Sequence, residues 1–421
     1  MEKHIKAFHE TTEKPNITRM ITSYGHLTYC SNIHAGESWE DHFAKLKENV
    51  PAIKNELAPE EVFGLGLRLA DAASKTLQQQ QSLHEFKQWL SDNDVYVFTM
   101  NGFPYGNFHH TAVKDQVHAP DWLTSDRVAY TIRLAEILAE LLPNEMEGSI
   151  STSPLTYRFW HKEDEWNAVM KKATANLLLV VDKLIDLKQQ TGKTIHIDIE
   201  PEPDGLLDNG TEFLEWYLQY LLPLGIEHLQ SKGLNKNAAE EAIKAHIQLC
   251  YDVCHFAVGY EDHAAMIKKF EAHGIKTGKI QISAALKGRL DGSAVDKEKV
   301  INAFKIFNEP VYLHQVVARK KDGALLHYRD MPDALADSDR AAIEEWRAHY
   351  HVPLFIEHYD ILQSTQNDIK TVLDIQKKKP FAKYLEVETY TWEVLPTAMR
   401  LPIDQSISRE LKWVKDLLNN H

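Results

Sequence analysis

Ionisable side chains alternate with isoleucines in the strand-like segment Thr194–Glu200 (TIHIDIE). Successive residues of a β-strand point to opposite faces, so His196, Asp198 and Glu200 are expected to share one face. Burying ionisable groups is costly unless they are paired or bind a metal. The segment therefore predicts a strand whose polar face lies where chemistry takes place.

Three further strand-like segments carry polar residues in the same way: Asp252 in 247–252, Gln281 in 279–283 and Glu388 in 385–391. The carboxyl ends of parallel strands meet at one edge, and hard divalent cations prefer oxygen-rich sites. We therefore predict a metal site of Glu200, Asp252, Gln281 and Glu388, with His255 beside it, three residues after Asp252. The alternative is a set of hydrogen-bonded polar residues in the interior, which the mutual repulsion of converging carboxylates disfavours.

Other polar residues near predicted strand ends are weaker candidates, because a single histidine is more often structural or exposed. We predict that they contribute to substrate binding: His34, Arg68, Asn101, His109, His314 and His351. The sequence contains no G-x-S-x-G motif and no phosphate-binding P-loop. A serine-hydrolase triad of that kind and a nucleotide triphosphatase therefore have no support.

Short strand-like runs alternate with longer helical stretches such as 125–142 and 165–190. Seven such units precede residue 284, and an eighth strand is predicted at 385–391, which indicates an α/β fold of the (β/α)8 TIM-barrel type. Residues 284–384 are predicted to be an insertion between the seventh and eighth strands, with strand-like pieces at 311–319, 325–329 and 350–355. We expect one domain over 1–421, with an N-terminal extension at 1–23. An open doubly wound sheet is the second choice.

The order and spacing of eight short motifs resemble the xylose isomerase-like barrels, which include sugar isomerases and epimerases, and most closely the EboE-type proteins. The motifs are LTYCSNIH, FTMNGFPYGNFH, GSISTSP, IEPEP, CYDVCH, YLHQVV, HVPLF and LEVETYTW, within residues 24–396. The resemblance implies a metal tetrad at Glu200, Asp252, Gln281 and Glu388. It leaves open whether Glu202 and Glu386 replace Glu200 and Glu388 as metal ligands. It also leaves open whether His314 or His351 corresponds to the metal ligands that the family has further along the chain.

The composition excludes several classes of protein. With 47 Lys and Arg against 61 Asp and Glu, the net charge of −14 argues against a nucleic-acid partner. Three cysteines in 421 residues cannot form a disulfide framework and suit a reducing cytoplasm. Neither a signal peptide nor an apolar run of membrane-spanning length is evident, so we expect a cytoplasmic protein without membrane insertion.

These observations favour a metal-dependent sugar or sugar-phosphate isomerase or epimerase. A divalent ion (Mn, Mg, Co or Zn) would polarise a hydroxy-carbonyl substrate, while Glu200 and Glu388 move the proton. The EboE resemblance links this activity to metabolite traffic and to other proteins of the same operon as partners. Two alternatives remain: a multi-zinc phosphodiesterase of the endonuclease IV type, and a non-catalytic metabolite-binding protein.

Overall fold

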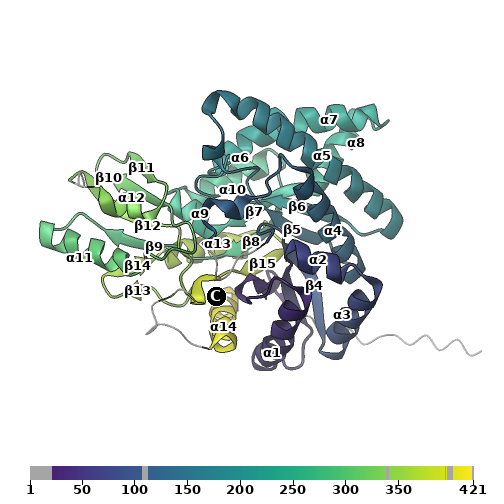
Figure 1. The fold of residues 1–421 in the computed structure, drawn as a ribbon, viewed down its shortest axis with the longest axis horizontal. Helices are drawn as coiled ribbons and strands as arrows, with labels where there is room; N and C mark the ends of the chain where they lie inside the picture. Colours follow the sequence, from purple (N-terminus) through teal and green to yellow (C-terminus); the bar gives the residue numbers. More distant parts are fainter. Residues whose placement is uncertain (1–20, 107–111, 338–340, 394, 396–401, 420–421) are drawn as a thin grey trace, which may run out of the picture.

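Eight parallel strands form a barrel in the computed structural model, which describes residues 21–106, 112–337, 341–393, 395 and 402–419 (Figure 1). Around the barrel the strands follow the order of the chain: β2 (Gly25–Tyr29), β3 (Phe63–Arg68), β4 (Val95–Asn101), β5 (Gly148–Thr152), β6 (Ile195–Ile199), β7 (Ile247–Asp252), β8 (Thr277–Ile282) and β15 (Tyr384–Val387). The short strand β1 (Ile21–Thr22) adds an antiparallel edge to β2. The predicted TIM barrel is confirmed.

The barrel closes between β2 and β3 through a few contacts. Thr28 Oγ1 donates to the Gly64 carbonyl at 2.8 Å and accepts from the Gly66 N–H at 2.9 Å, and Cys30 forms a parallel bridge with Gly66. A Cβ on Gly66 would lie 2.0 Å from Glu386 Oε1 and 2.6 Å from the Tyr29 carbonyl. Glycine is therefore required here. This closure rules out the open doubly wound sheet.

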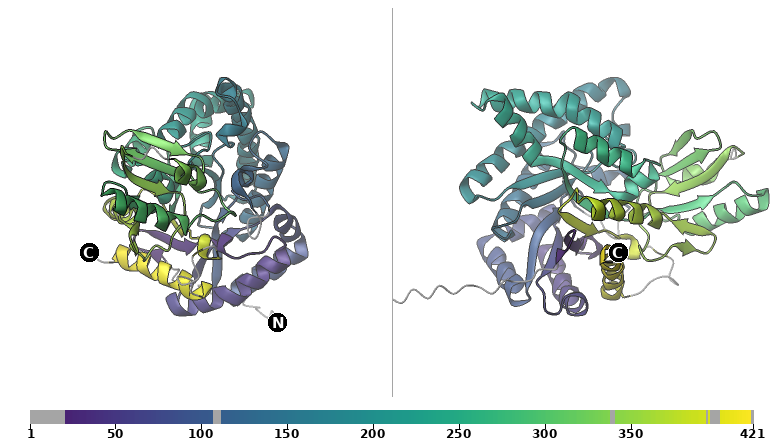
Figure 2. Two further views of the ribbon diagram at one scale, coloured as in Figure 1. Left: turned by 60° about the vertical axis from the view of Figure 1, so that its left-hand side comes forward. Right: turned by 180° about the vertical axis from the view of Figure 1, so that it is seen from behind.

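Helices follow the strands and cover the outside of the barrel, as both views of Figure 2 show. Their bounds are α1 (Trp39–Leu57), α2 (Asp71–Leu77), α3 (Gln80–Asp92), α4 (Ser125–Leu141), α5 (Trp166–Thr191), α6 (Gly210–Trp216), α7 (Leu222–Ser231), α8 (Lys236–His246), α9 (Val253–Val258), α10 (His263–Ala272), α13 (Gln366–Lys378) and α14 (Ile403–Asn419). A π-helical turn, Tyr217–Leu221, joins α6 to α7, so the helix continues past Pro223, which lies in the first turn of α7. Proline has no N–H to donate to the turn before it, and the π-helical turn, an irregularity in the hydrogen-bond ladder, stands directly before Pro223. None of the described helices is long and apolar enough to cross a membrane.

The insertion between β8 and β15 folds into a second sheet, which stands beside the barrel in Figures 1 and 2. Its antiparallel order is β11 (Leu325–Tyr328), β10 (Val316–Lys320), β12 (Ile343–Ala348), β9 (Leu286–Arg289), β14 (Leu362–Ser364) and β13 (His358–Tyr359), with helices α11 (Ala294–Lys305) and α12 (Met331–Ala336). The predicted insertion is confirmed. Buried residues of both sheets belong to one hydrophobic cluster, so the sheets share a core. The single-domain description of the chain stays a prediction.

Several predicted strands have different bounds in the structure, and one is absent. The segment 350–355 is not a strand; β12 precedes it, and Pro353, which lacks an N–H for a sheet ladder, lies within the predicted run. The first barrel strand ends at Tyr29, before a 3₁₀ turn at Ser31–Ile33, and the last ends at Val387. His34 and Glu388 therefore lie on loops at the barrel mouth.

Helix α14 brings a buried carboxyl group against the loop that carries Glu388. Glu410 is 1% exposed, and its Oε1 accepts hydrogen bonds from Leu354 N–H at 3.0 Å and Thr389 Oγ1 at 2.9 Å. Burial raises the pKa of Glu410 from 4.5 to about 8. The group is therefore neutral in the folded protein near neutral pH and is charged in the unfolded chain.

Glu410→Gln should make the protein more stable, and increasingly so between pH 5 and pH 8. In this window the folded wild-type chain holds a proton on Glu410 that the unfolded chain has lost, so wild-type stability falls as pH rises. Glutamine keeps the accepting oxygen and has no such proton, which gives a gain on the order of 3 kcal/mol at pH 8. Urea unfolding of both proteins across this range measures the difference. A difference that does not change with pH would contradict the assignment.

Candidate functional site

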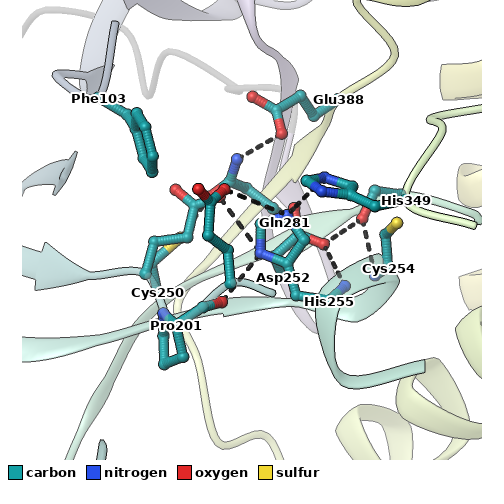
Figure 3. Close-up of polar contacts among 12 residues, drawn as sticks. Phe103, Pro201, Cys250, Asp252, Cys254, His255, Gln281, His349 and Glu388 are labelled. Atoms are coloured by element: carbon teal, nitrogen blue, oxygen red, sulfur yellow. Dashed lines mark hydrogen bonds and ion pairs between the residues drawn. The ribbon is translucent and has the colours of Figure 1, made fainter. Parts of the chain in front are cut away.

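Three buried carboxylates meet at the carboxyl ends of three barrel strands. Glu200 follows β6, Asp252 ends β7 and Glu388 follows β15, and each offers an oxygen within 4.8 Å of the other two. Their exposed fractions are 4%, 0% and 4%. Figure 3 shows Asp252 and Glu388 from this cluster, with Gln281 between them. We call these three residues the carboxylate cluster.

The carboxylate cluster has the chemistry of a cation site. Burial, with repulsion from the other carboxylates, raises the pKa of Glu200 well above its ordinary value and that of Glu388 to about 8. Among the described residues, none donates a hydrogen bond to Glu200 Oε2 or Asp252 Oδ2, although both atoms are buried. Buried acceptors without a donor are costly, and carboxylate oxygens are the ligands that hard divalent cations prefer. The cluster therefore fits a divalent cation.

Amide groups fix the orientation of Glu388. Its Oε1 accepts from Asn32 Nδ2 at 2.8 Å and from Asn101 Nδ2 at 2.9 Å, and its Oε2 accepts from Gln281 Nε2 at 2.7 Å. Gln281 turns its oxygen to the Cys250 thiol, which donates to it. In this arrangement Gln281 and Asn101 position Glu388. The role of Gln281 as a metal ligand stays a prediction.

Three histidines adjoin the carboxylate cluster. His255 lies on α9, directly after β7, whereas His349 and His351 follow β12 of the inserted sheet. The Nε2 atoms of His255 and His349 are 3.1 Å apart, and all three residues are at least 94% buried. Figure 3 shows the rings of His255 and His349 facing each other beside Asp252. We call these three residues the imidazole cluster.

A pocket with a cavity volume of about 70 Å³ lies over both clusters. Its polar residues are Asn32, Asn101, His118, Glu200, Glu202, His255, Gln315, His349, His351 and Glu388, and its apolar and aromatic residues are Phe103, Pro104, Val113, Val117, Tyr312, Leu313 and Tyr390. Lys114 is the one Lys or Arg among the described residues that line it, and its Nζ lies 2.7 Å from Asp330. The pocket therefore combines acidic and imidazole groups with an apolar wall.

Solved structures of similar fold include several sugar epimerases. The IolI protein with a bound zinc atom is 12% identical, over 93% of this chain and 98% of that one (TM-score 0.46). A xylose isomerase domain protein from Planctomyces limnophilus is 9% identical over 94% and 97% (0.45), and an L-ribulose 3-epimerase is 13% identical over 94% of each (0.40).

The chain is similar to xylose isomerase-like barrels. This likeness, which the motifs predict, concerns the fold alone. No protein-family model and no curated protein sequence matches the chain. The EboE-type resemblance stays a prediction.

The residues predicted to bind substrate divide into two groups. Asn101 and His351 line the pocket, whereas His34, Arg68 and His314 are not among its lining residues. Arg68 contacts Glu37 at 3.3 Å and the Gly106 carbonyl at 2.8 Å. His34 contacts the Tyr29 hydroxyl, and His314 lies between Glu309 and the His349 carbonyl. His109 lies outside the described residues.

Several pocket residues were not predicted from the sequence. His118 ends a 3₁₀ segment, Lys114–His118, far from any strand, and its Nε2 lies 2.8 Å from Glu202 Oε1. Glu202 could be named only as an alternative to Glu200, because both follow the same strand. Gln315 lies within the predicted strand-like piece 311–319, but β10 begins only at Val316, so Gln315 precedes the strand. Nothing in the sequence pattern identifies His118 or Gln315.

A buried ion pair lies within the barrel below the carboxylate cluster. Lys279 Nζ is 2.5 Å from Glu386 Oε2, and both side chains are fully buried. Lys279 also contacts Thr99 Oγ1 and the Met100 carbonyl. Burial alone would lower the pKa of Lys279, but Glu386 raises it above its ordinary value. Lys279 is therefore charged, and it lowers the pKa of Glu200 and Glu388 above it.

Lys279→Met should reduce the free energy of unfolding by about 3–5 kcal/mol, because it leaves Glu386 buried without its partner. The double variant Lys279→Met/Glu386→Leu should recover most of this loss, because it removes both charges and keeps the volume filled. Urea unfolding of the two variants and the wild type provides the comparison. Equal losses in the single and double variants would show that the lysine acts through packing, not charge.

Proposed function

We propose that the chain is a metal-dependent isomerase or epimerase acting on a small hydroxy-carbonyl metabolite of the sugar class. The observation that carries this proposal is the carboxylate cluster: three buried carboxylates, two with an unpaired oxygen, at the carboxyl ends of barrel strands under a pocket. Barrel enzymes place their catalytic residues at this end. The EboE-type resemblance extends the proposal to a cytoplasmic role in metabolite traffic, with other proteins of the same operon as partners.

Glu200, Asp252 and Glu388 would hold the cation. The chemistry that a bound divalent cation supplies is Lewis-acid stabilisation of negative charge at a carbonyl group. Asp252 is fixed for this role, since its Oδ1 accepts from Ser283 Oγ at 2.7 Å and from His255 N–H at 3.1 Å, which leaves Oδ2 for the cation.

Glu200 is the residue best suited to move the proton. Its Oε2 accepts no hydrogen bond from the described residues, whereas three amide N–H groups hold both oxygens of Glu388. The Glu200 carboxylate removes a proton from the carbon next to the substrate carbonyl; the C–H electron pair forms a C=C bond with the carbonyl carbon, and the π pair of the C=O bond moves onto the oxygen. Return of the proton to the same carbon from the opposite face gives the epimer; return to the neighbouring carbon gives the isomer. Glu388, which also lines the pocket, is the candidate for this second transfer.

Glu200→Gln should lower the rate of proton exchange at least 100-fold, because general acid–base catalysis supplies about 10²–10⁴ in rate. Deuterium uptake from D₂O into a panel of ketoses and aldoses, followed by NMR, measures the exchange. Chelator should abolish it and Mn²⁺, Mg²⁺, Co²⁺ or Zn²⁺ should restore it. Glu261→Gln is the matched control, because Glu261 is a largely buried glutamate that does not line the pocket. Ligand binding without exchange, unaffected by chelator, would instead favour the non-catalytic metabolite-binding alternative.

The charges around the pocket favour an uncharged sugar over a sugar phosphate. The one lining cation among the described residues, Lys114, is paired with Asp330, and Arg68, predicted to bind substrate, contacts Glu37 instead. A phosphate group beside buried carboxylates would lose its hydration without gaining an unpaired cationic side chain among the described lining residues.

The neutral sugar should therefore exchange its proton with a kcat/KM about 10-fold or more above that of its phosphate ester. A 10-fold ratio corresponds to about 1.4 kcal/mol of activation free energy. Competition between the two in one NMR sample measures the ratio. Lys114→Met is the control, and it should leave the ratio in favour of the neutral sugar. Preference for the ester, lost in Lys114→Met, would overturn the neutral-substrate assignment and leave the reaction type standing.

A further inference from the structure

We propose that a cavity at the amino-terminal ends of the barrel strands binds a small oxyanion of the phosphate class. The cavity has a volume of about 470 Å³ and lies where β6, β7, β8 and β15 begin, at the opposite end of the barrel from the carboxylate cluster. A ligand site here is separate from the proposed function and does not rest on it. It gives a role to His196 and Asp198, which share the polar face of β6 with Glu200.

Two buried polar side chains line this cavity. His196 is 2% exposed and Gln248 is 4% exposed. The Nδ1 atom of His196 lies 2.6 Å from Asp198 Oδ1, whereas its Nε2, at the other edge of the ring, has no hydrogen-bond partner among the described residues. Gln248 donates one of its N–H groups to the Ala245 carbonyl at 3.0 Å, which fixes the amide. A buried imidazole nitrogen is therefore left to a ligand.

A chain of hydrogen bonds with a single direction fixes the orientation of His196. Lys279, which can only donate, donates to Thr99 Oγ1 at 3.2 Å. Thr99 donates to Ser149 Oγ at 3.2 Å, and Ser149 donates to Asp198 Oδ2 at 2.5 Å. With both oxygens of the Asp198 carboxylate accepting, Nδ1 of His196 carries a hydrogen. The Nε2 atom then faces away from Asp198, on the cavity side of the ring.

The Nε2 atom of His196 can share a proton with a phosphate oxygen. Inorganic phosphate keeps at least one proton near neutral pH. If the imidazole is neutral, a P–OH group donates to Nε2; if the imidazole is charged, Nε2 donates to a phosphate oxygen. One hydrogen bond joins the ring and the ligand in either case, so the site does not depend on which of them holds the proton.

Lysine side chains around the cavity supply the charge that an oxyanion needs. Lys383 lies 2.8 Å from Glu147 and Lys379 lies 2.9 Å from Glu271, so these two pairs are balanced. Lys276 also lines the cavity and has no ion-pair or hydrogen-bond partner among the described residues. Burial raises the pKa of Glu147, but the positive charges around it hold that pKa below its ordinary value. The described lining residues thus leave one lysine for a ligand.

The two ends of the barrel differ in the ligand that their charges favour. The pocket at the mouth joins buried carboxylates to a lysine that is already paired. The cavity at the other end joins a lysine without a partner to a buried imidazole, beside an apolar wall that includes Phe270 and Phe381. Charge-assisted hydrogen bonds are the stronger ones, and a low local dielectric strengthens them further. An oxyanion is therefore favoured at this end.

Calorimetric titration of the full chain with inorganic phosphate tests this site. Chelator is present throughout, so that no metal at the mouth can hold the phosphate. The wild type should bind one equivalent. His196→Asn should weaken binding about 10-fold or more, because asparagine keeps a donor for Asp198 but lacks the nitrogen on the cavity side, and a hydrogen bond to a charged group is lost.

Two further variants change the charge at the cavity by one unit in opposite directions. Lys276→Met should weaken phosphate binding about 2- to 5-fold, and Glu271→Gln, which frees Lys379, should tighten it about 2- to 5-fold. Both effects should shrink as salt is added. A tighter complex cannot result from a failure to fold. Circular dichroism melts identify any variant that does fail.

Lys268→Met is the matched control and should leave the affinity unchanged, because Lys268 is an exposed lysine of α10 that does not line the cavity. A second titration, with glycerol 3-phosphate, separates two sources of the same group: tighter binding of the ester indicates an organic phosphate, and equal binding indicates free phosphate.

Three results would overturn the site. They are no phosphate binding by the wild type, an affinity that His196→Asn and Lys276→Met leave unchanged, and an affinity that falls only in Lys114→Met, which would place the phosphate at the mouth. None of them touches the proposed function, which is measured by proton exchange at the carboxylate cluster.

Discussion

The repulsion among three buried carboxylates is the constraint on which the rest of this site depends. Glu200, Asp252 and Glu388 lie within a few ångströms of one another with almost no access to water. Like charges so close cannot all remain ionised without compensation. Amide N–H groups compensate one of them, Glu388, and leave the facing oxygens of the other two open. A proton or a bound cation can supply the remaining compensation, which is why the pKa of Glu200 is raised well above its ordinary value.

The barrel and the insertion contribute to this compensation in different ways. The buried lysine below the cluster cancels the charge of Glu386, so it reduces the repulsion without neutralising the three carboxylates above. The Glu386 side chain fits only because Gly66 has no Cβ, which ties barrel closure to the ion pair. The segment after β12 of the inserted sheet places His351 near Asp252 and His349 near Glu202. It therefore forms part of the wall of the site.

The sequence predicts those site residues whose positions follow from the alternation of side chains along a strand. Glu200, Asp252 and Glu388 could be predicted because each stands at or directly after the carboxyl end of a strand with clear alternation, and parallel topology brings these ends together. The eight barrel strands and the position of the insertion followed from the same pattern. Other pocket residues could not be predicted in this way. Gln315 and His118 reach the pocket from irregular segments, and the direction of such segments depends on tertiary packing. Lys279 and Glu386 occupy inward strand positions, but no local pattern says that a lysine and a glutamate on neighbouring strands will pair.

The charge balance of the complete site connects the metal content to the substrate. Glu202 lies beside the three residues of the carboxylate cluster, and all four acidic side chains except Asp252 line the pocket. One divalent cation would offset part of the negative charge of these groups without reversing its sign. A site that carries no excess positive charge when loaded does not attract a phosphate, and the described lining residues add only a lysine that is already paired. The apolar wall then lowers the local dielectric, so that hydroxyl and carbonyl groups gain more from the cation than they would in water. The same balance that makes the buried carboxylates tolerable therefore selects an uncharged, oxygen-rich ligand.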